Sequence, residues 1–121
     1  METAEVKNDL GTIRVADRVI ALTAKEAALR VPGIAGMGET FLHSISSVIS
    51  DGNTDGVHVG FKEGVVTLDL YVCVRHGERI PAIALQLQEM VKEEVSDALG
   101  VRVAAVNVNV SDILFDKDKP E

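Results

Sequence analysis

The stretch Val65-Val-Thr-Leu-Asp-Leu-Tyr-Val-Cys-Val-Arg75 decides the fold. Aliphatic side chains take every second position of it, and mostly polar or small ones take the positions between. The aliphatic set is Val66, Leu68, Leu70, Val72 and Val74. Side chains of a strand alternate between its two faces, so this pattern predicts a long strand with one face on a core. The other face is expected to meet water or a partner.

The segments on either side of this strand are also readable. Val57–Phe61 alternates in the same way, and Lys62–Gly64 has the length of a hairpin connection. After a turn at His76-Gly77, a helix is expected from about Ile80, with Pro81 in its first turn and Gly100 as a left-handed cap. The apolar stripe expected on this helix is Ile80, Ile83, Ala84, Leu87, Met90, Val91, Val95, Ala98 and Leu99.

The last strand is predicted over Arg102–Ile113. Val106, Val108 and Val110 alternate there with Asn107, Asn109 and Ser111, and Ala104-Ala105 marks a bulge or the true start of the strand. A strand, a helix of about five turns and a returning strand form the usual crossover between parallel strands.

The N-terminal half contributes one further strand and one further main helix. Thr12–Val15 fits a short strand, and a helix from Asp17 to Val31 is expected to bury Val15, Val19, Ile20, Thr23, Ala27 and Val31 before Pro32-Gly33 ends it. The glycines of Gly33–Gly38 predict a mobile connection. A short amphipathic helix is expected at 39–49 and a surface loop at 50–56.

Together these elements predict one α/β (α+β) domain over residues 11–113. We expect a two-layer sandwich, in which a three- to four-stranded mixed sheet carries two main helices on one face in the order (β)αββαβ. Residues 1–10 and 114–121 are expected to be a flexible acidic tail and a charged tail.

Composition argues against several classes of function. The formal net charge is −7, from 12 basic and 19 acidic residues, and the basic ones are scattered, which disfavours nucleic acid and an anionic membrane surface as partners. Only 3% of the residues are aromatic, so the large walls typical of small-molecule pockets are missing. The polar start METAEVKND and the short apolar runs predict a cytoplasmic protein.

No sequence motif points to catalysis or to a cofactor. The single cysteine, Cys73, excludes an internal disulfide, and His43, His58 and His76 lack the spacing of metal ligands. Gly33-Ile-Ala-Gly36-Met-Gly38 lacks the Lys-Ser/Thr ending of a phosphate-binding loop. Its first four residues are similar to the GXXG loop of KH modules, so a KH-like nucleic-acid-binding module is the alternative function.

The outward face of the strand pair is the candidate site for protein contacts. Thr67, Asp69 and Tyr71 are expected to lie beside Asn107 and Asn109 in a shallow polar surface. An ordinary solvated face is an open alternative. A third hypothesis is an enzyme that uses Asp69 with His58 or Tyr71, and it requires those groups to be adjacent.

An ordered set of short segments resembles the alkaline shock protein family of bacterial envelope stress response proteins. The set comprises Gly11-Thr-Ile-Arg-Val15, Pro32-Gly-Ile-Ala-Gly36, Val66-Thr-Leu-Asp-Leu-Tyr-Val-Cys-Val74, His76-Gly77, Ile80-Pro81, Gln88-Glu89, Val91, Val95 and Gly100-Val-Arg-Val-Ala-Ala-Val-Asn-Val-Asn-Val110. It departs from the family at Ala16, where a capping Ser is common, and at 39–56, which matches no family feature.

This resemblance implies a non-enzymatic cytoplasmic protein in envelope homeostasis or stress. Some members of that family self-associate, and some are held at the membrane by a separate membrane-anchored protein. Neither catalytic residues nor a cofactor nor a small-molecule substrate is implied.

Overall fold

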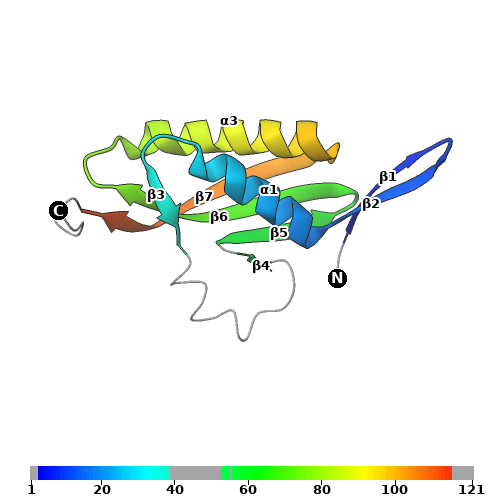
Figure 1. Ribbon diagram of the computed structural model, residues 1–121, viewed down its shortest axis with the longest axis horizontal. Coiled ribbons are helices and arrows are strands. Elements are labelled where there is room, and N and C mark those ends of the chain that lie inside the picture. Colours follow the sequence, from blue (N-terminus) through cyan, green and yellow to red (C-terminus); the bar gives the residue numbers. More distant parts are fainter. Residues whose placement is uncertain (1–2, 39–52, 55, 116–121) are drawn as a thin grey trace.

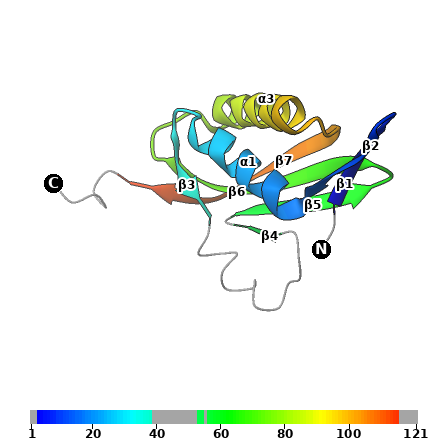
Figure 2. The same cartoon turned by 45° about the vertical axis from the view of Figure 1, so that its right-hand side comes forward.

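The computed structural model describes residues 3–38, 53–54 and 56–115. Its elements are β1 (Thr3–Asn8), β2 (Gly11–Ala16), α1 (Asp17–Leu29), β3 (Ile34–Met37), β4 (Asn53–Thr54), β5 (Val57–Lys62), β6 (Val65–Arg75), α3 (Ile80–Leu99) and β7 (Val103–Leu114). Both helices lie on the same face of one mixed sheet, and the β1–β2 hairpin projects beyond it (Figures 1 and 2). The predicted two-layer α+β fold is confirmed, with five strands in the sheet instead of three or four.

Strand β6 is the centre of the sheet. β7 runs parallel to it along one side, with Leu68 opposite Val106 and Leu70 opposite Val108. On the other side, β5 pairs antiparallel with the first half of β6 and β3 with the second half. The predicted parallel crossover through α3 is therefore confirmed.

The local sequence signals explain two features of this sheet. Glu63 and Gly64 both have positive φ, at 52° and 82°, which is the backbone that a tight two-residue hairpin turn needs between β5 and β6. In β7, Ala104 is the extra residue where the register shifts between Val103 and Ala105, so the predicted bulge is confirmed.

The core lies between the inner face of the sheet and the two helices. The alternate aliphatic residues of β6 are at most 1% exposed, and they pack against Ile20 of α1 and Leu87 and Val91 of α3, all fully buried. The inward stripe predicted for β7 is only partly right. Val106 is buried, but Val110 is 36% exposed, because it lies beside Ile80, where α3 begins.

The buried faces of the helices also differ in part from the predicted ones. In α1, Val19 is exposed and Ala21, Ala24 and Ala28 are buried instead, so small side chains bring this helix close to the sheet. In α3, Ile80 and Ala98 are exposed at the two ends of the expected stripe. Ala16 caps α1 without a side-chain hydrogen bond, as expected from the absent Ser.

The glycine-rich segment is a strand and not a mobile connection. Ile34–Met37 forms β3, with Ile34 opposite Val74 and Met37 opposite Val72 of β6. A KH-type GXXG loop must stand free to clamp a nucleic-acid backbone. Here the second glycine, Gly36, is paired with Cys73 inside the sheet, so the structural basis of that alternative is wrong.

Two further segments differ from the sequence prediction. Residues 3–8, expected within a flexible tail, form β1, which pairs with β2 from Thr3–Ala16 to Asn8–Gly11. Asn53–Thr54, expected within a loop, pairs with β5 as β4. The predicted helix at 39–49 and most of the C-terminal tail lie outside the described residues, and Leu114 is the last residue of β7.

Candidate interaction surfaces

The predicted polar surface is assembled on the sheet face opposite the helices. Asp69 is opposite Asn107 in the register, and Tyr71 is opposite Asn109. The Asn107 Nδ2 group donates a hydrogen bond to Asp69 Oδ1 at 2.9 Å, and Asn109 Nδ2 donates to the carbonyl of Leu70 at 3.2 Å. These bonds hold the side chains in fixed positions. A surface whose side chains are already ordered loses less entropy when a partner binds.

The adjacency required by the enzyme hypothesis is present for one pair. His58 of β5 is the direct cross-strand neighbour of Asp69. Both side chains are half-exposed on an open sheet face, whereas acid–base catalysis is favoured in a concave site that excludes water. The arrangement is better suited to hydrogen bonding with a partner than to proton transfer.

Cys73 lies on the same face, one position along from Val72. Burial and the nearby negative charge of Asp112 raise the pKa of its thiol, although Arg75 acts in the opposite direction. A raised pKa keeps the thiol protonated and unreactive near neutral pH. In this environment Cys73 acts as a small side chain of β6.

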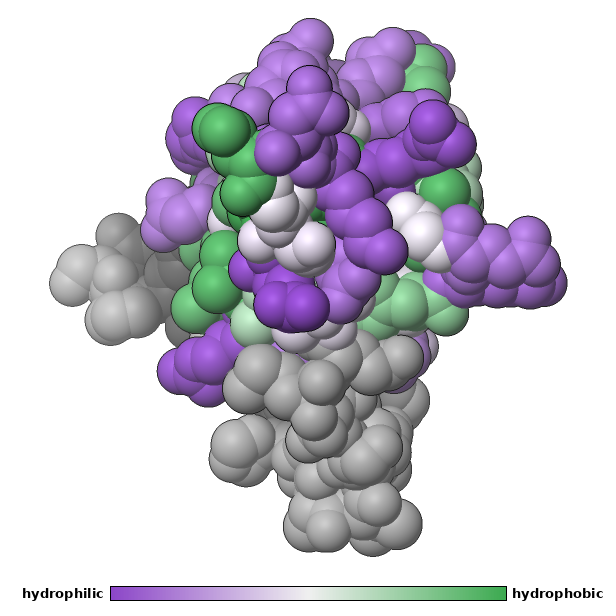
Figure 3. All heavy atoms as spheres, turned by 90° about the vertical axis from the view of Figure 1, so that its right-hand side faces the viewer, coloured by the Kyte–Doolittle hydropathy of each residue, from purple (hydrophilic) through white to green (hydrophobic). Residues whose placement is uncertain are grey.

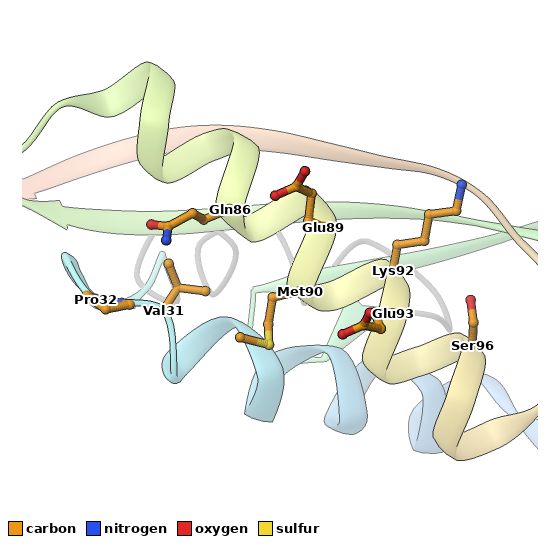
Figure 4. Close-up of a pocket in the computed structure, with 8 residues that line it drawn as sticks. All are labelled: Val31, Pro32, Gln86, Glu89, Met90, Lys92, Glu93 and Ser96. Carbon is orange, nitrogen blue, oxygen red and sulfur yellow. The ribbon is translucent and has the colours of Figure 1, made fainter.

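A groove lies on the outer side of the helical layer, between α3 and the end of α1 (Figure 4). It encloses about 690 Å³, and Val31, Pro32 and Met90 form its apolar part. Of its polar lining residues on α3, Gln86, Glu89, Lys92 and Glu93 are exposed and Ser96 is half-buried. Polar groups on a solvated rim do not converge on one point, as a binding or catalytic site requires.

Sequence reasoning missed a second surface, at the end of β7. Val110 and Ile113 are 36% and 37% exposed, and with Ile80 and Phe115 they line a shallow hollow of about 480 Å³. The ring of Phe115 lies 4.6 Å from that of His76. Among the described strands, only β6 pairs with β7, so the other edge of β7 is open. The signal for this surface is the run Val103–Ser111, which contains no charged residue.

The opposite end of the molecule is different. Viewed from the β1–β2 hairpin, hydrophilic residues cover most of the described surface and hydrophobic ones form small separate patches (Figure 3). The hairpin carries an exposed ion pair between Arg14 and Glu5, at 3.0 Å. Exposed pairs of this kind contribute little free energy.

Two kinds of feature are absent from the described residues. No cluster of three or more His, Cys, Asp or Glu is placed to hold a metal ion among residues 3–38, 53–54 and 56–115. No helix within that part of the chain is long and apolar enough to cross a bilayer.

Solved structures share this fold. A MamM-CTD structure superposes with a TM-score of 0.51 at 16% identity, covering 80% of this chain and 99% of that one. Other MamM CTD structures, including a copper form and a manganese form, match at TM-scores of 0.51 and 0.50 and at 15% and 16% identity. Each covers 80% of this chain, and 98% and 99% of its own. At this identity the likeness concerns the fold alone.

Comparison of sequences gives closer relatives. The uncharacterized protein Spy1535 of Streptococcus pyogenes is 30% identical over 114 residues, covering 93% of this chain and 87% of the relative. The uncharacterized Bacillus subtilis proteins YqhY and YloU are 28% and 30% identical, covering 93% and 90% of this chain and 84% and 93% of their own lengths. A protein-family profile matches residues 5–115. The chain therefore belongs to the alkaline shock protein 23 family, which has a cell envelope-related function.

Proposed function

We propose that this protein is a non-enzymatic scaffold that acts at the cell envelope through protein–protein contacts. In this proposal it associates with further copies of itself and is recruited from the cytoplasm by a membrane-anchored protein. The observation that carries it is the polar sheet face of Thr67, Asp69, Tyr71, Asn107 and Asn109, whose hydrogen bonds fix it in the free protein.

Family and geometry support this proposal from two directions. The family is related to the cell envelope. The described residues form open faces rather than an enclosed site: the Asp69–His58 pair is half-exposed, and the groove beside α3 has a solvated polar rim. Open surfaces with ordered side chains suit protein partners.

The test is a crosslinking pull-down from cytoplasmic and membrane fractions of the native cell. Thr67→Arg places a large cation at the half-buried end of the polar face, next to Asp69, while Gln86→Arg makes a similar change on the exposed side of α3. We expect the wild type and Gln86→Arg to retain the same membrane-fraction protein and Thr67→Arg to lose it. Equal retention by all three chains, or retention by none, would contradict the proposed contact face.

A further inference from the structure

The open edge of β7 has a defined hydrogen-bonding pattern. The side chains of Asn109 and Ser111 donate hydrogen bonds to carbonyls of β6. Asn109 bonds to Leu70 at 3.2 Å, and Ser111 bonds to Val72 at 3.4 Å. On the other side, Gln88 of α3 donates from Nε2 to the carbonyl of Val106 at 3.0 Å. Backbone groups of successive strand residues face opposite sides, so Val108 and Val110 present their N–H and C=O groups to the outside.

The residues along this edge lack the usual protection of an edge strand. Natural edges are blocked by charged side chains, especially lysine, or by proline. Val103–Ser111 contains neither, although 26% of the whole chain is charged. Gln88 caps the first outward carbonyl only, and the apolar side chains of Val110 and Ile113 remain exposed beside the edge.

We propose that this edge pairs with the same edge of a second copy, antiparallel and about a two-fold axis through Asn109. This inference rests on the self-association in the proposed function and assigns its surface. In this register Val108 exchanges backbone hydrogen bonds with Val110 of the second copy, giving about four bonds across the contact. Asn109 faces Asn109 of the second copy on the polar side, and the aliphatic pairs meet on the helix side.

The charge distribution of the chain points to a second copy as the partner at this edge. A two-fold contact sets each residue against its own symmetric patch, and a molecule of net charge −7 repels its copy unless that patch is neutral. The paired stretch 107–111 holds no charge, and Asp112 lies beyond it, after the register shift at Ser111. The same register therefore avoids every like-charge pair along the edge.

The size of the contact sets its strength. Five paired residues over 107–111 form a strip about 17 Å long and about 10 Å wide, roughly 170 Å² on each copy, because the register shift at Ser111 ends the regular part of the strand. This strip alone is well below the roughly 800 Å² per partner of a stable complex, and the apolar residues beside it add further area. The pairing is accordingly a reversible dimer with a dissociation constant in the micromolar range.

The test changes Asn109, the residue that faces itself across the two-fold axis. Asn109→Lys places lysine against lysine across the axis, and Asn109→Asp places aspartate against aspartate. Each change is expected to weaken the dimer at least about tenfold, since like charges directly opposite repel. Mixing the two variants sets lysine against aspartate and should restore a heterodimer near wild-type affinity. Gln86→Lys is the control, because it adds the same charge on the exposed groove side of α3, away from the strand edge.

Sedimentation velocity from about 1 to about 200 μM provides the readout. Val110→Pro is a second variant, which removes an outward N–H while leaving the ladder to β6 intact, and urea unfolding reports whether it folds. This variant should also weaken the dimer. A wild-type oligomer that Asn109→Lys and Asn109→Asp leave unchanged would overturn the edge pairing while self-association stands. A wild type that stays monomeric would overturn both the pairing and the self-association of the proposed function.

Discussion

Gly56 is the position where the structure predicts the sharpest effect of a single methyl group. This buried glycine precedes β5, and its carbonyl accepts the backbone N–H of Tyr71 at 2.8 Å. Its φ is +87°, and an added Cβ atom would lie 2.8 Å from Met37 Cβ and 3.0 Å from the Tyr71 carbonyl oxygen. Both contacts are with atoms on or next to the backbone, so no side-chain rotation relieves them.

Two costs of Gly56→Ala follow. Left-handed backbone costs an L residue about 1–2 kcal/mol. Shifting the backbone to relieve the overlap adds about 1–3 kcal/mol. The expected loss in the free energy of unfolding is thus about 2–5 kcal/mol, which lowers the Tm of a domain of this size by roughly 10 °C or more.

Urea unfolding followed by circular dichroism measures this loss, with Gly36→Ala as the control. No atom lies within 4 Å of a Cβ built on Gly36, and its φ is not positive. Alanine there is expected to be neutral or to stabilise by less than about 1 kcal/mol, because it reduces the entropy of the unfolded chain. A Gly56→Ala protein within about 0.5 kcal/mol of wild type, or equal losses in both variants, would refute the reasoning.

Three further predictions concern the core, the thiol and the strand edge. Leu87→Ala removes a fully buried side chain and should cost about 2–5 kcal/mol by urea unfolding, while Leu85→Ala, on a 55% exposed side chain, should stay within about 0.5 kcal/mol. Iodoacetamide should alkylate Cys73 appreciably only at higher pH than an ordinary thiol, because its pKa is raised. Asp112→Asn should move that pH profile downward, and an unmoved profile would contradict the electrostatic cause. Gln88→Leu removes the side-chain hydrogen bond to the Val106 carbonyl and should lower the free energy of unfolding by about 1 kcal/mol. An unchanged free energy of unfolding would show that water replaces this bond.

The sequence predicted those elements whose pattern is local and long. The alternation of β6 identified the central strand and its buried face, and Pro81 and Gly100 marked the ends of α3. The polar face could also be predicted, since alternation alone places Asp69 on the outside of β6.

Short or non-local elements were missed for physical reasons. β3 has four residues, one of them Gly36, and it is a strand only because β6 supplies its hydrogen bonds. β1 carries few apolar residues, and its strand depends on pairing with β2. Strand propensity is weak without the partner strand, so neither segment gave a clear signal by itself.

The exposed end of β7 could not be predicted from alternation, which says which side a residue faces but not whether anything covers that side. The place along the helix decides it. Val106 lies beside Gln88, in the body of α3, and is buried. Val110 lies beside Ile80, the first residue of α3, and is partly bare.

The two proposed contacts lie side by side on one strand, and this bears on how they work together. Asn107 and Asn109 belong to the polar face, and the edge of the same strand carries the proposed axis. Pairing two copies there joins their sheets, so the polar face of one copy continues into that of the other. A partner that binds one face then meets a second face at short distance, and the effective concentration of the second contact is high. In this proposal, a reversible dimer of weak faces holds a multivalent partner more strongly than either face alone, without any new contact.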